Sequence, residues 1–144
     1  MNKLYCIAFT HNNIPIEQIG MFHVDDAQYA NRFEKIKEQC DLHEFLFLST
    51  CNRVEFLITT THEVNQKFLT HFFACFNPNF TKEEINFAVE KALLFEDNKA
   101  IKHLFEVASS IDSLVVGERE IITQVRNAYD KCHALKLTGE VIRL

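Results

Sequence analysis

Seven residues in the middle of the chain, six of them polar or reactive, join two apolar runs. Segment 49–55 reads Ser-Thr-Cys-Asn-Arg-Val-Glu, and the flanking runs 44–48 and 54–60 have the composition of β-strands. A tight hairpin normally carries Asn-Gly, Asp-Gly or Gly-X, and no glycine lies near this segment. The chain therefore places a thiol, an amide, a guanidinium and two hydroxyls where simple turn residues would suffice.

Cys51 is the residue of this segment that can act as a nucleophile. The thiolate rather than the thiol is reactive, and a neighbouring guanidinium such as that of Arg53 favours the thiolate. Thr50 and Asn52 can hydrogen-bond a substrate, and Arg53 could instead hold a substrate carboxylate through two parallel hydrogen bonds. The same residues also allow a structural interpretation, in which Cys51 is a small buried residue and Arg53 forms a surface ion pair with Glu55.

Two segments resemble the signatures of one family, the glutamyl-tRNA reductases. Segment 49–55 is similar to the family's nucleophile motif, and residues 103–118, HLFEVASSIDSLVVGE, are similar to its second signature, about 50 residues further on. Residues 4–11 are similar to its opening strand and histidine. On this resemblance the chain is identified as the N-terminal catalytic domain of such an enzyme.

The resemblance implies an activity for Cys51. The family reduces glutamyl-tRNA to glutamate-1-semialdehyde with NADPH, the first step of tetrapyrrole (porphyrin, haem) biosynthesis by the five-carbon route. The Cys51 thiolate would attack the ester carbonyl, release the tRNA 3′ end and leave a thioester, which NADPH would then reduce to the aldehyde.

Family members continue into an NADPH-binding Rossmann domain and a helical dimerisation domain. This chain has three glycines and no G-x-G-x-x-G fingerprint. We therefore expect NADPH to bind a domain that is not in this chain and the isolated chain to show at most esterase activity on glutamyl-tRNA. The full-length protein is expected to form a homodimer through a domain absent here and to channel its product to the next enzyme of the pathway.

Matching motif positions assigns further roles by resemblance. His103 acts as acid/base or positions the ester, and Arg53 binds the side-chain carboxylate of the glutamyl group. The chain carries Arg119-Glu120 where the family usually has Pro-Gln. Without the resemblance, His103 is typical of a surface or core-edge residue. The acidic residues within 118–120 are then typical of a helix N-terminus, which favours negative side chains. The residues expected to bind substrate are Thr50, Asn52, Arg53, Ser113, Glu118, Arg119, Glu120 and Gln124.

The order of apolar patterns predicts an α+β fold, a ferredoxin-like βαββαβ sandwich followed by C-terminal helices, and the resemblance implies the same fold. The expected elements are strand 4–9, helix 25–39, strands 44–48 and 54–60, helix 63–76, a helix after the capping box at 81–84, strand 92–96, and helices 97–109 and 118–136. We expect one domain, 1–144, with an α/β sandwich over about 1–97 and a helical part over about 98–144 that leads to the NADPH-binding domain.

The helix over 97–109 carries an apolar stripe that predicts which side it buries. Ile101, Leu104, Phe105 and Ala108 recur at helical spacing, and His103 lies off that stripe, in a position that we expect to be semi-exposed. His11 follows the first strand and is more typical of a loop residue than of a site residue.

The amino-acid composition excludes several classes of protein. An apolar content of 47% and fourteen phenylalanines exclude a disordered chain. No apolar stretch is long enough to span a membrane and no signal peptide opens the chain, so we expect a cytoplasmic protein. The net charge of −5, without a Lys/Arg cluster, indicates that other parts of the protein hold most of the tRNA body.

The five cysteines are odd in number and contain no C-x-x-C pair, which argues against a disulfide framework. Cys40-x-x-His43 and His71-x-x-x-Cys75 have spacings that a zinc site could use. Their separation and the apolar context of His71 favour structural roles, so we expect no metal.

Two other classes of function are compatible with these residues. A cysteine-dependent acyl transferase or thioesterase would use Cys51 and His103 in the same way and would need no nicotinamide domain. A non-catalytic module that binds tRNA or protein is the second alternative, and the acidic charge counts against its tRNA-binding form.

Overall fold

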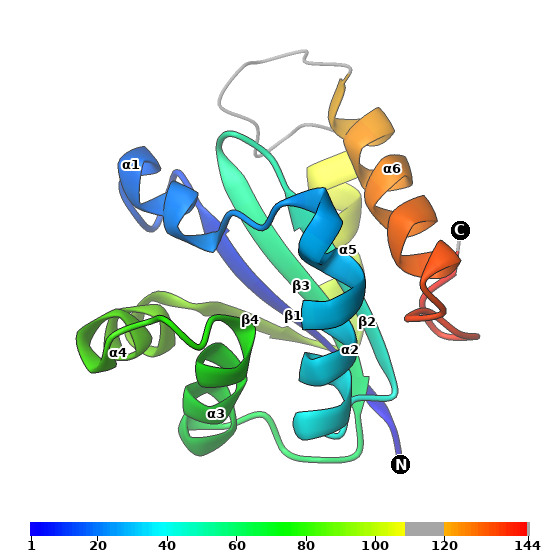
Figure 1. The fold of residues 1–144 in the computed structure, drawn as a ribbon. Coiled ribbons are helices and arrows are strands. Elements are labelled where there is room, and N and C mark those ends of the chain that lie inside the picture. The colour runs from blue at the N-terminus through cyan, green and yellow to red at the C-terminus, as the bar shows by residue number, and fades with distance from the viewer. Residues whose placement is uncertain (109–119, 144) are drawn as a thin grey trace.

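A four-stranded antiparallel sheet forms the centre of the molecule (Figure 1). The computed structural model describes residues 1–108 and 120–143 of the chain. The strand order is β2-β3-β1-β4, which is the order of a ferredoxin-like βαββαβ fold. The α+β fold predicted from the sequence is therefore confirmed. The strands are β1 (Lys3–Thr10), β2 (Glu44–Ser49), β3 (Arg53–Thr60) and β4 (Leu93–Glu96).

Helices cover both faces of this sheet. On one face, α2 packs beside α3, which in turn packs on α4. On the other, α5 contacts β1 and β4 while α6 contacts β2 (Figure 1). Because β2 and β3 are covered on both faces, every residue of β3 and every residue of β2 except the last is buried. The helices are α2 (Tyr29–Gln39), α3 (Gln66–Phe76), α4 (Lys82–Lys91), α5 (Asn98–Ala108) and α6 (Glu120–Ala134).

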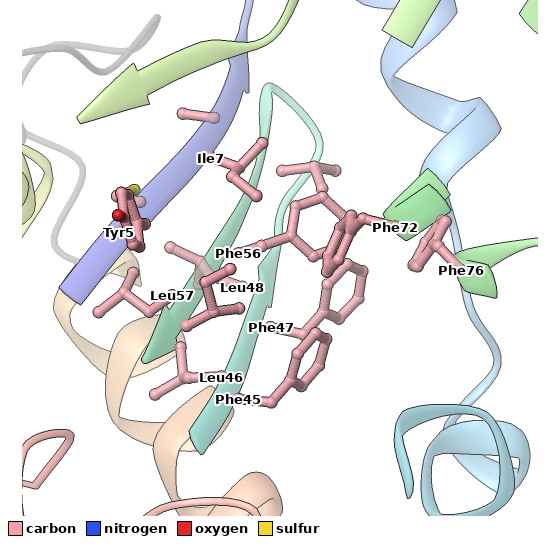
Figure 2. Packing of buried hydrophobic residues seen from close by; sticks show 14 of the residues in the cluster. Tyr5, Ile7, Phe45, Leu46, Phe47, Leu48, Phe56, Leu57, Phe72 and Phe76 are labelled. Carbon is pink, nitrogen blue, oxygen red and sulfur yellow. The ribbon is translucent and has the colours of Figure 1, made fainter. Parts of the chain in front are cut away.

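Phenylalanines fill the layer between the sheet and the pair α2–α3. Phe56 of β3 lies at the centre of this layer, with its ring centroid 5.2 Å from those of Phe72 and Phe76 and 5.3 Å from that of Phe47 (Figure 2). Most of these rings meet edge-on or tilted, the arrangement that aromatic quadrupoles favour. The phenylalanine richness of the sequence is thus explained by core packing.

Local signals set the helix ends. The capping box predicted at the start of α4 is present, because Thr81 Oγ1 accepts from the Glu84 amide at 3.1 Å and the Glu84 carboxylate accepts from the Thr81 amide at 2.8 Å. The segment before α2 forms a short helix α1 (Ile16–Ile19) and two 3₁₀ turns, η1 (Gly20–Phe22) and η2 (Asp26–Gln28). No helix in the described part of the chain is long and apolar enough to cross a membrane.

The face that α5 buries differs from the sequence-based prediction. His103, expected to be semi-exposed, is 4% exposed, whereas Ile101 and Phe105 of the predicted apolar stripe are 44% and 71% exposed. The physical reason lies on the sheet, where the buried carboxylate of Glu55 requires a hydrogen-bonding partner. His103 provides that partner, and small Ala100 beside it lets the helix approach the sheet closely.

Candidate functional site

The nucleophile motif forms the loop between β2 and β3, and hydrogen bonds fix its shape without glycine. The Thr50 amide donates to the Arg53 carbonyl at 2.9 Å, and the Thr50 hydroxyl donates to Asn52 Oδ1 at 3.0 Å. The Asn52 amide donates back to Thr50 Oγ1 at 3.3 Å. Asn52 is buried in this arrangement and Cys51 is exposed at the loop tip. The structural interpretation of Cys51 as a buried residue is therefore wrong.

His11 lies beside the same loop, a placement that the sequence did not indicate. Its backbone amide donates to the Asn52 carbonyl at 3.1 Å, which extends the β1–β3 pairing past the end of the strands. The imidazole Nδ1 is buried and has no hydrogen-bond partner within the described residues. A nitrogen of this kind can accept or donate a proton when a substrate arrives. The only signal in the sequence was a histidine directly after the first strand.

An open cavity of about 590 Å³ adjoins Cys51. It is bounded by the β2–β3 loop, by the α1–η1 segment and by α6, so three separate parts of the chain contribute to it. The structure thus brings Thr50, Cys51 and Gln124 together, three residues to which the resemblance assigns roles in a substrate site. The lining residues are Ile16, Glu17, Ile19, Gly20, His23, Ser49, Thr50, Cys51 and Gln124.

Below the loop, Arg53, Glu55 and His103 form a buried charged cluster. Arg53 Nη1 donates to Glu55 Oε2 at 2.7 Å, and His103 Nε2 lies 2.6 Å from Glu55 Oε1. The Cys6 thiol donates to the same Oε1 at 3.3 Å. Arg53 is 1% exposed and Glu55 is 0% exposed, so the predicted surface ion pair is in fact a core ion pair.

Electrostatics keeps Glu55 ionised in this cluster. Burial by itself raises the pKa of the Glu55 carboxyl, but the hydrogen bond and charge of His103 and then those of Arg53 outweigh it, and the net pKa is lowered. The pKa of the Cys6 thiol is raised well above its usual value, first by burial and then by the Glu55 charge. Cys6 is therefore an unreactive thiol, in contrast to exposed Cys51.

His103 is positioned by its contacts in the core. Its ring stacks on Phe95 of β4 with a centroid distance of 4.2 Å and an interplanar angle of 12°, while its Nε2 faces Glu55. Among the described residues, the cavity beside Cys51 does not include His103 or Arg53 in its lining. The acid/base role of His103 and the carboxylate-binding role of Arg53 therefore stay predictions.

The second signature falls mostly outside the described residues. Ser113, Glu118 and Arg119 lie there, so their predicted contacts with substrate stay predictions. Glu120 is the first residue of α6, and its predicted role is likewise untested. Gln124 lies one turn further along α6. It is a predicted substrate-binding residue, and it lines the cavity beside Cys51.

Comparisons with known proteins agree with this arrangement. A family model described as "Glutamyl-tRNAGlu reductase, N-terminal domain" matches residues 7–144. The chain is 37% identical over 126 residues to a glutamyl-tRNA reductase of Campylobacter jejuni, covering 87% of this chain and 28% of that protein. It is 31% identical over 131 residues to the Helicobacter pylori enzyme, covering 90% of this chain and 29% of the relative.

A solved structure is similar over nearly the whole chain. The glutamyl-tRNA reductase from Methanopyrus kandleri superposes with a TM-score of 0.72 at 26% sequence identity, covering 97% of this chain and 30% of that one. The chain thus spans under a third of the length of the relatives that it matches, with the shares running from 28% to 31%.

Proposed function

Because the chain belongs to the family of glutamyl-tRNA reductase N-terminal domains, we propose that it supplies the nucleophile of an NADPH-dependent reductase that forms glutamate-1-semialdehyde from glutamyl-tRNA. The observation that carries the proposal is the exposed Cys51 thiol, held on a hydrogen-bonded loop at the edge of a cavity shared with Thr50 and Gln124. The tetrapyrrole pathway follows from the family.

The proposed step is an acyl transfer from oxygen to sulfur. The Cys51 thiolate attacks the ester carbonyl carbon, the C–S bond forms, and the bond to the ribose oxygen breaks. The departing oxygen takes up a proton and the tRNA leaves as an alcohol. A histidine would carry this proton from the thiol to the leaving oxygen; His11 is one candidate, since its amide bonds to Asn52 and its Nδ1 has no partner within the described residues, although it does not line the cavity. His103 is the alternative that the resemblance implies.

Recognition of the glutamyl group is assigned to polar side chains around the cavity. Thr50 and Gln124 line it and can hydrogen-bond the amino acid, while buried Asn52 acts by shaping the loop. For Arg53 to bind the side-chain carboxylate, the substrate has to share the guanidinium with Glu55, which already accepts from Nη1 at 2.7 Å.

The described residues do not fit a nicotinamide dinucleotide. Every strand pair in the sheet is antiparallel, and no strand leads through a glycine-rich turn into a helix, the arrangement that holds a pyrophosphate. We therefore assign no hydride step to residues of this chain. The domain division at about residue 97, the homodimer, the product channelling and the cytoplasmic location stay proposals from the resemblance.

Deacylation of glutamyl-tRNA by the chain tests the proposal. We expect release of glutamate above the spontaneous rate, because a thioester formed without a hydride donor is hydrolysed slowly by water. Cys51→Ala should reduce this to the spontaneous rate, and Gln124→Ala should slow it by about 10-fold or more, as loss of one polar transition-state contact does. Cys132→Ala, which removes a buried thiol of α6, is the matched control and should retain the activity. Undiminished deacylation by Cys51→Ala would contradict the proposal.

A further inference from the structure

Three side chains of types that can ligate a metal, from two distant parts of the sequence, meet at one end of the helical layer opposite α5. Cys40 is the C-cap residue of α2, and His71 and Cys75 lie one turn apart on α3, which packs beside α2. One ligand atom from each of the three residues lies within 4.8 Å of the other two. Cys75 Sγ is 3.7 Å from His71 Nε2 and 4.0 Å from His71 Nδ1.

We propose that Cys40, His71 and Cys75 form a binding site for a thiophilic divalent cation, with Zn²⁺ as the first choice. In a tetrahedral zinc site with Zn–S near 2.3 Å and Zn–N near 2.0–2.1 Å, neighbouring ligand atoms lie about 3.6–3.8 Å apart. The separation of 4.0 Å between Cys75 Sγ and His71 Nδ1 is close to this spacing. Small side-chain rotations around a common centre would complete the site.

The imidazole of His71 is already oriented for a metal. Its Nε2 lies 3.0 Å from the Gln39 carbonyl, an acceptor, so this nitrogen carries the proton and donates it. The neutral ring then has its lone pair on Nδ1, the nitrogen that would bind the cation. A metal-bound histidine commonly donates its second nitrogen to a carbonyl in this way. Gln39 and Cys40 are adjacent, so the end of α2 supplies both a ligand and the group that orients the histidine.

Charge and access decide which ions the site can take. Cysteine ligates a metal as the thiolate, so a bound ion has to displace the thiol protons, which Zn²⁺ does and which Mg²⁺ and Ca²⁺, with their preference for oxygen ligands, do not. Two thiolates neutralise the charge of a divalent ion.

The site is open on one side. A surface cavity of about 600 Å³ is lined by His71 and Cys75 and gives the ion an entry path and room for a water as fourth ligand. Two cationic residues line the same cavity, of which Arg32 is directed to the Phe76 carbonyl and ring. Lys35 is exposed and can turn to solvent. A bound ion would tie the C-terminus of α2 to α3.

Zinc binding by the 144-residue chain tests the proposal. The chain, freed of metal by a chelator and kept reduced, is titrated with Zn²⁺ against a chromophoric competitor, and native mass spectrometry counts the bound ions. We expect one zinc per chain. Both Cys75→Ser and His71→Ala should weaken binding by at least about 100-fold, more than loss of an outer-shell partner does. Neither position is in the buried core, and circular dichroism checks that both variants fold.

Two matched variants serve as controls. Cys51→Ser removes an exposed thiol elsewhere, and His43→Ala removes the histidine that shares the Cys40-x-x-His43 spacing without joining the cluster. Both should bind zinc like the unmodified chain. Zinc should also raise the Tm of the unmodified chain and leave that of Cys75→Ser unchanged.

A cobalt titration examines the ligand type. Bound Co²⁺ should show a thiolate-to-metal charge-transfer band that is weaker in Cys75→Ser, which retains only the Cys40 thiolate. The proposal is overturned if no zinc binds, if Cys75→Ser and His71→Ala bind as tightly as the unmodified chain, or if only Cys51→Ser loses binding.

Discussion

Replacement of Glu55 by alanine should be among the most destabilising single changes in this domain. The carboxylate is fully buried and accepts from Arg53 at 2.7 Å and from the Cys6 thiol at 3.3 Å, with His103 at 2.6 Å. Removing one partner of a buried ion pair costs about 3–5 kcal/mol, because the remaining charge loses its compensation. Against a total stability of about 5–15 kcal/mol, this is a large fraction.

Urea unfolding followed by circular dichroism measures the effect. With an m-value of about 2 kcal/mol/M, a loss of 3–5 kcal/mol lowers the midpoint by roughly 2 M. Glu55→Gln should lose about half as much, because the amide keeps the volume and one acceptor but not the charge. Asp26→Ala, which removes the exposed pair with Lys131, is the control and should change stability by under about 1 kcal/mol.

The reasoning is refuted if Glu55→Ala changes the free energy of unfolding by no more than Asp26→Ala does. The same result would mean that the buried cluster beneath the nucleophile loop makes no net contribution to the fold.

Three further predictions concern the scaffold. Folding lowers the pKa of Glu55, so the stability that its carboxylate contributes is fully present above its unfolded pKa of about 4.3 and is lost as the pH falls below that value. The urea midpoint of the unmodified chain should therefore fall more steeply between pH 5 and pH 3 than that of Glu55→Gln. Parallel curves for the two proteins would contradict this prediction. Phe56→Ala should lower the free energy of unfolding by about 3–5 kcal/mol in urea titrations, since its ring packs against six others at the centre of the core. Thr81→Ala should lower it by about 1 kcal/mol through loss of the α4 cap, and a change of zero would show that the capping box is dispensable.

Local sequence patterns predicted the parts of the fold that depend on local chemistry. The two largely apolar runs around the loop form β2 and β3, and nearly all of their residues are buried because both faces of these strands are covered. The Thr81–Glu84 capping box marked the start of α4 because both of its hydrogen bonds form within four residues.

Such local patterns did not predict contacts between residues that are far apart in the sequence. The apolar stripe with Ile101 and Phe105 predicted the wrong buried face for α5, since His103 is drawn inward by Glu55, a residue 48 positions earlier. In the same way, the sequence separation of Cys40 from Cys75 argued against a cluster, yet the packing of α2 on α3 brings them together.

The candidate site was predictable in its chemistry and only partly in its geometry. The reactive residue types at 49–53 identified the loop, and exposed Cys51 agrees with a nucleophile. Gln124 lines the cavity beside Cys51 because of where α6 packs. His11 lies beside Asn52 because of the register in which β1 and β3 pair. Neither relation leaves a periodic signal in the sequence.

The most direct test of the proposed function is the intact mass of the chain after mixing with glutamyl-tRNA and quenching in acid. Formation of a thioester on Cys51 predicts a covalent glutamyl adduct on the unmodified chain and none on Cys51→Ala. An adduct that persists in Cys51→Ala would contradict the assignment of the nucleophile. Absence of an adduct both here and in a full-length relative treated in the same way would contradict the thioester mechanism itself.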